Sequence, residues 1–374
     1  MTTRPLSILQ TCFSRSWGGL EMQALELSVG LQERGHRITL AAPPGSRLAV
    51  EAVRHHVPLL PLNVTGYFHP LLLRRLRASL RSGAVDIIHC QHSRDLATVV
   101  PAMQMSGRTI PIVLSKRVGS YIAKKDLFHR YTHGAISRVL AISNVIHRNV
   151  IATTPVSPER VLTLHDAVDT SVFSAETVDR FKVRREAGIP DDALVVGFVG
   201  RFSPGKGLED LLQAAHLLQP HHPAVRYLIV GEASHGEESY ADAIHELSRR
   251  LDLQDVAVFA GYRSDVPSVM ASFDILAFPS HAESFGVVLI EAMAMGKPVV
   301  STNCDGVLDI VLDGTTGITV PPKDPPAMAH GLEQLIADAD LRRRMGAAGR
   351  VRVLEHFDRT VQLRKLEEIY YSLV

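Results

Sequence analysis

The sequence contains little cysteine and no long apolar run. Cys12, Cys90 and Cys304 are far apart and form no C-x-x-C pair, which argues against a disulfide framework and against a zinc ribbon. No stretch approaches the ~20 apolar residues of a membrane-spanning helix. Residues 1–13 match a signal peptide poorly and favour a first β-strand. These absences predict a protein of the reducing cytoplasm.

Two nucleotide-binding patterns are also absent. No G-x-G-x-x-G follows the first expected strand, whereas an NAD-dependent dehydrogenase would need that fingerprint. Residues 200–206 have P-loop spacing, but Gly207 stands where a P-loop has the Ser or Thr that holds magnesium. The one Asp-x-Asp, at 338–340, lies in an expected surface helix. A dehydrogenase and a P-loop enzyme are therefore disfavoured.

The chain has little net charge, but its two halves differ strongly. Residues 1–165 contain 20 Lys and Arg and 8 Asp and Glu, a balance of +12, whereas residues 166–374 contain 20 and 31, a balance of −11. Such asymmetry indicates an anionic partner for the first half. The alternative is a pair of unequally charged, solvated surfaces.

Strand, glycine-containing turn, helix and strand follow one another twice in the chain. The first unit begins with a strand at 6–12, a turn containing Gly18 and Gly19, and a helix at 20–34. The second begins with a strand at 194–200, a turn at 201–207 and a helix from 208. This order predicts an α/β protein with two Rossmann-like domains, for which 374 residues suffice.

The segment 274–302 carries the densest pattern. A buried strand, a loop, a helix at 287–295 closed by Gly296 and another buried strand form one crossover of a parallel sheet. The loop amides of Ser284, Phe285 and Gly286 come at or near the start of the helix, where an anion such as a diphosphate is favoured.

Two carboxylates belong to the same segment. Glu283 stands at the mouth of the expected anion site, and Glu291 is eight residues later, roughly 80° around and about 12 Å along a helix. A ligand with hydroxyl groups at both ends and phosphate between them would suit this arrangement. A nucleotide sugar is such a ligand. The alternative is a pair of solvated glutamates on an ordinary amphipathic helix.

The sequence PSHAESFGVVLIEAMAMG at 279–296 resembles the signature of glycosyltransferase family 4. The resemblance covers the whole chain and is most specific at 194–320. It implies the GT-B fold, in which two Rossmann-like domains with parallel sheets face each other across a cleft. It also implies transfer of a sugar, with retained anomeric configuration, from a nucleotide-diphosphate sugar to a hydroxyl acceptor. Neither a cofactor nor a metal is implied, and a UDP-sugar is the favoured co-substrate.

The resemblance also implies roles for individual residues. Arg201 and Lys206 would neutralise the diphosphate as the glycosidic bond breaks, and with Glu283 they are the expected catalytic residues. The residues expected to bind the donor are Gly18, Gly19, Arg201, Lys206, Tyr262, Arg263, Glu283, Ser284, Phe285, Gly286 and Glu291.

On the acceptor side, the candidates are His92 and Arg117. His89, Cys90 and His92 could suggest zinc, but neighbours on a strand point to opposite faces and no second ligand cluster follows. Contact of this loop with sugar or acceptor is the favoured interpretation. Many relatives have a histidine where Arg117 stands, and an arginine at this position could hold a phosphate.

The expected domains are 1–168, on the acceptor side, and 169–357, which would bind the nucleotide sugar. A final helix at about 358–374 would pack back onto the first domain. The expected acceptor is lipid-linked or a polysaccharide, as in envelope polysaccharide or lipopolysaccharide-type glycolipid synthesis. Two alternatives stay open: a nucleotide-sugar epimerase of GT-B-like fold, and a non-catalytic protein that binds a membrane surface.

Two basic segments bear on the anionic partner. Residues 69–81 form an amphipathic helix that could lie on an anionic membrane surface, although a crossover helix with its leucines inward is favoured. Residues 121–131 mix aromatic and basic side chains and could meet a lipid-linked acceptor. Nucleic acid is not expected, since no binding module accompanies them. The chain is therefore expected in the cytoplasm, free or peripheral on the inner face of the membrane.

Overall fold

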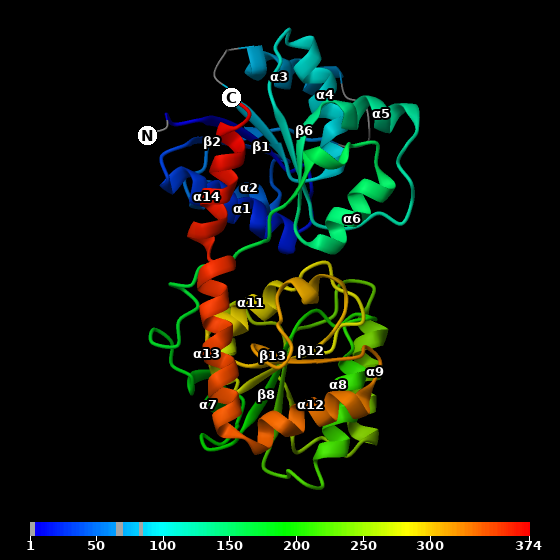
Figure 1. Ribbon diagram of the computed structural model, residues 1–374, viewed down its shortest axis with the longest axis vertical. Coiled ribbons are helices and arrows are strands. Elements are labelled where there is room, and N and C mark those ends of the chain that lie inside the picture. Colours follow the sequence, from blue (N-terminus) through cyan, green and yellow to red (C-terminus); the bar gives the residue numbers. More distant parts are fainter. Residues whose placement is uncertain (1–3, 65–69, 82–84) are drawn as a thin grey trace. The chain divides into compact units, whose positions relative to one another are not determined.

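The computed structural model describes residues 4–64, 70–81 and 85–374. The chain divides into two compact units, each with its own parallel sheet (Figure 1). Unit 1 comprises Met1–Asp166 and Gln362–Val374, and unit 2 comprises Ala167–Val361. No helix of the described residues is long and apolar enough to span a membrane.

Unit 1 contains a seven-stranded sheet in the order β3-β2-β1-β4-β5-β6-β7, with every neighbouring pair parallel. Its central strands are buried along their length, as expected for a parallel sheet covered on both faces. The strands are β1 (Ser7–Thr11), β2 (Arg37–Ala42), β3 (Leu59–Pro61), β4 (Ile87–Cys90), β5 (Ile112–Lys116), β6 (Ile136–Ala141) and β7 (Val161–Thr163).

The crossovers of unit 1 are helical. The helices are α1 (Gly19–Glu33), α2 (Arg47–Arg54), α3 (Pro70–Arg81), α4 (Leu96–Met105), α5 (Leu127–Gly134) and α6 (Asn144–Thr153), with short 3-10 helices η1 (Ser93–Asp95) and η2 (Pro158–Arg160). In α3, the side chains of Leu73, Leu76 and Leu80 are buried. These burials support the crossover interpretation of this basic helix over Pro70–Arg81. Residue 69, where the predicted helix began, lies outside the described residues.

The last helix, α14 (Arg359–Tyr371), packs against unit 1 beside α1 and β2 (Figure 1). Glu367 accepts hydrogen bonds from Arg34 and contacts His36, and the Tyr370 hydroxyl lies 2.6 Å from His89 Nδ1. Arg364 and Lys365 of this helix are exposed. The helix is held by buried apolar side chains and by the carboxylate of Glu367, which pairs with the cationic Arg34.

Unit 2 contains a six-stranded sheet in the order β10-β9-β8-β11-β12-β13, again parallel throughout. The strands are β8 (Val195–Val199), β9 (Arg226–Val230), β10 (Ala257–Phe259), β11 (Ile275–Phe278), β12 (Val299–Thr302) and β13 (Gly317–Val320). The helices are α7 (Lys182–Glu186), α8 (Leu208–Leu218), α9 (Glu238–Arg250), α10 (Val266–Ser272), α11 (Val287–Ala294), α12 (Pro325–Ala337) and α13 (Ala339–His356), with 3-10 helix η3 (Asp305–Asp309).

Residues 170–190 contain little regular secondary structure. Only α7 is helical there. The carboxylate of Asp169 accepts a hydrogen bond from the Ser171 amide, and that of Asp179 accepts one from the Phe181 amide. Such local side-chain bonds compete with helical hydrogen bonding and favour turns.

Both sheets reverse their strand order at one place, and this reversal positions the sites. In unit 1 the reversal lies between β1 and β4, and in unit 2 between β8 and β11. In open parallel sheets, ligands bind beyond the carboxyl ends of the strands at such a point. The loops that follow β8 and β11, and those that follow β1, β4 and β5, are therefore the first places to look.

Candidate functional site

The candidate donor site of unit 2 is formed by the loop after β8 (residues 200–207) and the loop after β11 (residues 279–286). Their strands are neighbours, with Ile275 paired to Val196 and Leu276 to Gly197. The His281 amide donates a 2.8 Å hydrogen bond to the Gly205 carbonyl, which joins the two loops. Segments about 80 residues apart in the chain thus form one structure.

Two charged contacts fasten the same loops. Lys206 Nζ lies 2.7 Å from Glu283 Oε2, and both side chains are largely shielded from solvent. His281 Nε2 lies 2.7 Å from Asp210 Oδ2 at the start of α8. The structure therefore brings together two of the three predicted catalytic residues, Lys206 and Glu283. Lys206 belongs to the loop after β8 and Glu283 to the loop after β11, so the pair joins the two loops.

Glycine is required where these loops touch. Gly207 has φ +72°, and a Cβ at this position would lie 2.1 Å from the Pro279 carbonyl oxygen. The Gly306 amide donates to the Glu283 carbonyl at 2.9 Å, and a Cβ on Gly306 would lie 2.2 Å from the Ser284 carbonyl oxygen. Any larger side chain would push the loops apart, since backbone atoms cannot yield as a flexible side chain does.

The start of α11 closes the site. Gly286 precedes the helix with φ +104°, and the Phe285 side chain is buried against Phe357 at a ring separation of 5.9 Å. Phe285 therefore anchors the loop, and only its amide could face a ligand. Glu291, within the helix, has a carboxyl group whose burial raises its pKa to about 7.

The remaining donor candidates of unit 2 lie in less enclosed positions. The Arg201 side chain is 58% exposed and 3.7 Å from the Glu237 carboxylate. Tyr262 is 60% exposed. The Arg263 guanidinium is already paired with the carboxylates of Asp265 and Glu186, at 2.8 Å each. The charge of Arg263 is thus balanced within the fold, whereas Arg201 retains freedom to meet an anion.

The last two donor candidates lie in unit 1 at the start of α1. The Gly18 amide donates to Glu21 Oε2 at 2.9 Å, which caps the helix. A Cβ on Gly19 would meet no atom within 4 Å. The space beside Gly19 is therefore open, and nothing in the loop itself requires glycine there.

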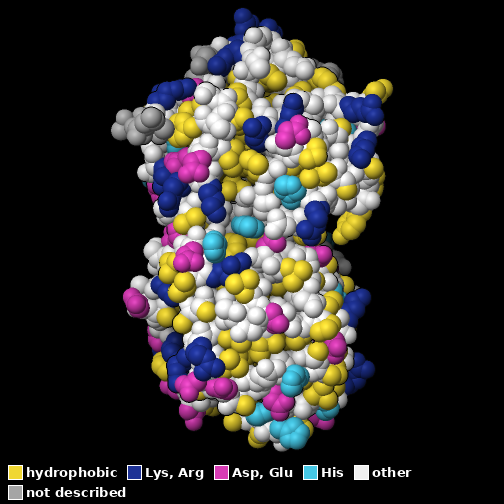
Figure 2. Space-filling model, in the orientation of Figure 1, with side chains coloured by type: hydrophobic (Ala, Val, Ile, Leu, Met, Phe, Trp, Pro, Cys, Tyr) yellow, Lys and Arg dark blue, Asp and Glu magenta, His cyan; other side chains and the backbone are white. Residues whose placement is uncertain are grey.

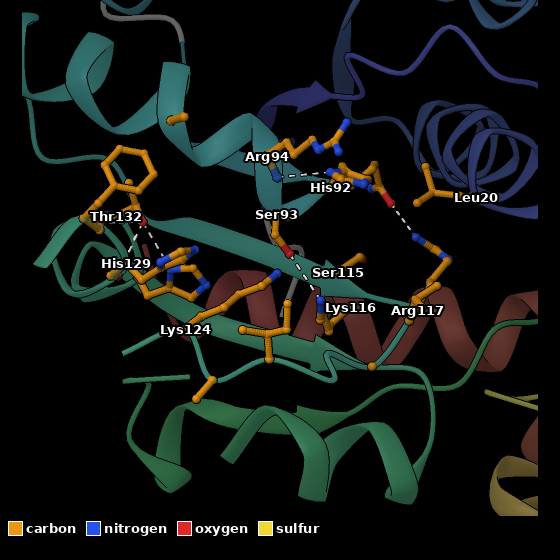
Figure 3. A pocket seen from close by; sticks show the side chains of 18 of the residues that line it. Leu20, His92, Ser93, Arg94, Ser115, Lys116, Arg117, Lys124, His129 and Thr132 are labelled. Carbon is orange, nitrogen blue, oxygen red and sulfur yellow. Dashed lines mark hydrogen bonds between the residues drawn. The ribbon is translucent and has the colours of Figure 1, made fainter. Parts of the chain in front are cut away.

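A pocket of about 680 Å³ lies in unit 1 beyond the carboxyl ends of β4 and β5 (Figure 3). Both acceptor-side candidates, His92 and Arg117, line it. The residues that line the pocket are Leu20, Gln91, His92, Ser93, Arg94, Ala97, Ser115, Lys116, Arg117, Val118, Gly119, Ile122, Ala123, Lys124, Asp126, Phe128, His129, Thr132 and His133.

The two predicted residues of this pocket are already engaged. Arg117 donates to Asp166 at 3.1 Å and, through Nη1, to Gln91 Oε1 at 2.7 Å. His92 Nδ1 accepts from the Arg94 amide at 3.0 Å, and burial lowers the pKa of His92. His92 therefore presents a neutral ring at neutral pH, and Arg117 supports the wall of the pocket.

Other residues of both sites were not singled out from the sequence. Asp210 and His281 form the second contact between the unit 2 loops, and Lys116 points into the unit 1 pocket together with Lys124 (Figure 3). Asp210 is the third residue of α8, a common place for an acid, so its position gave no sign of a histidine partner. The last residue of a buried strand, Lys116, could have been noticed because a charge is rare there.

Comparison with known proteins gives a consistent result across the chain. Residues 17–172 match Glycosyltransferase Family 4 and residues 179–352 match Glycosyl transferases group 1. The chain is 31% identical to the D-inositol 3-phosphate glycosyltransferase of Kribbella flavida, over 88% of this chain and 85% of that protein. It is 27% identical to the N-acetyl-alpha-D-glucosaminyl L-malate synthase of Bacillus anthracis, over 99% and 97%. The crystal structure of Anabaena HepE in complex with UDP superposes with a TM-score of 0.87 at 24% identity, covering 98% of this chain and 100% of that one.

Proposed function

Because this chain belongs to the group 1 glycosyltransferases of family 4, which retain anomeric configuration and use nucleotide-sugar donors, we propose that it transfers a sugar from a UDP-sugar to a hydroxyl group of an envelope polysaccharide or a glycolipid of the lipopolysaccharide type. The predicted GT-B fold class is confirmed. One observation carries the finer proposal: Lys206 and Glu283 meet at the strand-order reversal of unit 2.

We propose that the donor diphosphate binds between Lys206, Arg201 and the first amides of α11. Unpaired amides and the dipole at a helix start favour an anion, and Lys and Arg neutralise the charge that develops on a departing diphosphate. Glu283 would then turn from Lys206 toward the hydroxyls of the sugar, and Glu291 would accept from the ribose diol. The protein would thus stabilise an oxocarbenium-like centre through position and charge.

We assign the two activities to separate parts of the chain. Residues 169–357 would bind the nucleotide sugar, and residues 1–168 with 358–374 would bind the acceptor. Support for this assignment comes from the location of the candidate groups. Lys206, Glu283 and Glu291 belong to unit 2, whereas the pocket with His92 and Arg117 belongs to unit 1.

A thermal-shift screen of nucleotide sugars, beginning with UDP-sugars, tests the donor. A ligand present at 100 times its Kd stabilises the folded protein by about 2.7 kcal/mol, which a melting curve resolves.

The Glu283→Ala variant is expected to fold normally and to lose transfer by orders of magnitude, while the control Glu355→Ala, at an exposed position, keeps transfer activity. Unchanged turnover of purified Glu283→Ala, or an isomerised donor in the absence of acceptor, would overturn the proposal.

We also propose that the segment 121–131 of unit 1 meets an anionic membrane surface. Its apolar side chains are exposed to an unusual degree: Tyr121 fully, Leu127 to 82% and Ile122 to 75%. Basic side chains occur on the visible face of unit 1 beside exposed hydrophobic ones (Figure 2). Exposed aromatic and aliphatic groups next to cations suit the boundary between lipid headgroups and acyl chains.

Sedimentation with vesicles tests the membrane surface. Wild-type protein is expected to sediment with phosphatidylglycerol vesicles and to stay in solution with phosphatidylcholine alone. Replacing both Tyr121 and Leu127 by Ser should abolish sedimentation, because neither side chain supports the core. Replacing Val351 and Leu354, exposed residues of unit 2, by Ser is the matched control. Equal sedimentation of both double variants would contradict the assignment.

A further inference from the structure

The pocket of unit 1 is lined by more cations than its own carboxylates can balance. Arg94, Lys116, Arg117 and Lys124 line it, and Asp126 is the one lining carboxylate. Asp126 is already occupied, since it accepts from the backbone amide of His129 at 3.1 Å and from its ring Nδ1 at 2.5 Å. Arg117 is balanced by Asp166. The pocket therefore keeps two ammonium groups, those of Lys116 and Lys124, for which the described part of the chain supplies no carboxylate partner.

Lys116 is the more deeply placed of these two. Its Nζ lies 3.5 Å from Ser93 Oγ, and within the described residues it forms no ion pair. Lys124 extends toward the same space (Figure 3). Burial and the neighbouring charge of Lys124 together lower the pKa of Lys116 to about 8. The two ammonium groups repel each other across the pocket, and a bound anion would stabilise both of them.

Gln91 adds a second feature at the floor of the pocket. Its side chain is 1% exposed, and its Oε1 accepts from Arg117 Nη1 at 2.7 Å. That bond turns the amide so that Nε2 faces away from Arg117. Nε2 is buried and has no hydrogen-bond partner in the described part of the chain. A buried donor without a partner is costly, so an acceptor atom supplied by a ligand would be favoured here.

We propose that this pocket binds an anionic group of the acceptor, a phosphate or a carboxylate, between the ammonium groups of Lys116 and Lys124, with the Gln91 amide donating to one of its oxygens. The inference rests on the proposed function only in naming the bound molecule as the acceptor. Leu20, Ala97 and Val118 give the pocket apolar walls, which suit the carbon skeleton that carries the anion.

Calorimetric titration with inorganic phosphate tests the pocket, with malonate as the carboxylate probe. The titrations are made with UDP present, so that a donor site in unit 2 is filled. Lys116→Met is expected to weaken binding of the preferred anion at least about tenfold, because a charge-assisted hydrogen bond is lost. Lys365→Met, which removes an exposed lysine of α14 in the same unit, should leave it unchanged. Equal binding by the two variants would overturn the proposal.

A second variant guards against loss of folding. Gln91→Glu keeps the oxygen that accepts from Arg117 and replaces the buried donor by a carboxylate oxygen. It should abolish anion binding while the melting temperature stays near that of wild type. Phosphate binding by Gln91→Glu at wild-type strength would contradict the assigned contact. Displacement of bound phosphate by phosphatidic acid vesicles would place the anion on a lipid headgroup, and no displacement would place it on a soluble acceptor.

The same samples separate the two proposals. If UDP does not raise the melting temperature of wild-type protein, the proposed donor fails, but the difference between Lys116→Met and Lys365→Met still decides the anion site. If UDP stabilises both variants equally and phosphate also binds both equally, the anion site fails and the donor proposal stands.

Discussion

The candidate sites of the two units both lie beyond the carboxyl ends of parallel strands but differ in how their charges are balanced. In unit 2, Lys206 is paired with Glu283 and His281 with Asp210 across two loops. In unit 1, Lys116 and Lys124 face the pocket without carboxylate partners among the described residues. A ligand of unit 2 must exchange partners with an existing ion pair, whereas a ligand of unit 1 meets charges that are still uncompensated.

This difference predicts how selective each site would be among its ligands. The contact with Glu283 holds Lys206 in the absence of ligand. In the function proposed above, an incoming diphosphate would compete with Glu283 for this lysine. That exchange makes binding depend on a hydroxyl-bearing sugar that occupies the released carboxylate. An unpaired ammonium responds to any anion of suitable size. We therefore expect selectivity for the whole donor in unit 2 and broader anion tolerance in unit 1.

The largest effect should come from breaking the ion pair of unit 2. Lys206→Ala is expected to lower the transfer rate about 10²–10³-fold, the usual effect of removing one group that stabilises developing negative charge. The fold should persist, because Lys206 lies in a loop between β8 and α8 and belongs to no strand or helix. Steady-state kinetics with circular dichroism measure both outcomes. A rate within tenfold of wild type would show that the paired lysine does not act on the leaving group.

The next effect concerns the close contact of the two loops. Gly207→Ala should destabilise the protein well beyond about 1 kcal/mol, since it adds a clash with the Pro279 carbonyl to the strain of positive φ. Gly205→Ala is the matched control: its φ is +85°, but its Cβ would meet no atom within 4 Å. Denaturant unfolding of both variants gives the comparison. Equal losses would mean that the loop contact contributes no stability.

The unpaired lysine predicts a pH dependence confined to unit 1. The affinity for malonate, whose own charge stays constant above pH 7, should fall as pH rises through the pKa of Lys116, about 8, because only the ammonium form attracts the anion. Bound anion favours that form and shifts the midpoint upward. The other titratable side chains that line the pocket are His92, Lys124, Asp126, His129 and His133. Burial lowers the pKa of His92 and His133, so neither gains charge in this range.

Calorimetric titrations at pH 7, 8 and 9 measure this dependence. The loss should not exceed about tenfold per pH unit, the limit for one proton. Lys116→Met should bind weakly at all three values, whereas Lys365→Met should follow wild type. A pH dependence that survives in Lys116→Met would assign the titration to another group.

The smallest effect concerns Glu291 of α11, whose carboxyl pKa is shifted by burial. Its folded-state pKa, about 7, lies above the ordinary value of 4.5. The stability that this carboxyl group contributes in its protonated form is therefore fully present below about pH 4.5. That contribution is lost as pH rises through 7. At pH 8 the Glu291→Gln variant should melt a few degrees above wild type, because each kcal/mol gained in the free energy of unfolding raises the melting temperature by about 2–4 °C. The two melting curves should converge toward pH 5, and a lower melting temperature of Glu291→Gln at pH 8 would refute burial as the cause.

The unit 2 site could be predicted from the sequence because most of its residues lie in one continuous pattern. Glu283, the loop amides and Glu291 occur within nine residues, and a strand before them and a helix after them fix their place. The turn with Arg201 and Lys206 follows the first strand of the same unit, so topology alone brings it near. The pairing of Lys206 with Glu283 could not be predicted, since it depends on side-chain geometry between distant loops.

The pocket of unit 1 was harder to predict because its residues come from several short segments. Gln91 follows β4, Lys116 is the last residue of β5 and Lys124 follows that strand, so the three do not form one contiguous motif. The sequence suggested that Arg117 could hold a phosphate, and the structure shows that its guanidinium pairs with Asp166. Pairing of that kind depends on the arrival of a segment about 50 residues later in the chain. The roles of all these site residues remain predictions until ligands are tested.

Titration of UDP into wild type, Lys206→Ala and Lys116→Met tests the central claim most directly, because it compares the two units with one ligand. If unit 2 holds the donor diphosphate, the Lys206→Ala variant should bind UDP at least about tenfold more weakly than wild type, and the Lys116→Met variant should bind it with wild-type affinity. Wild-type affinity in Lys206→Ala, or an equal loss in both variants, would contradict the assignment of the donor to the paired lysine of unit 2.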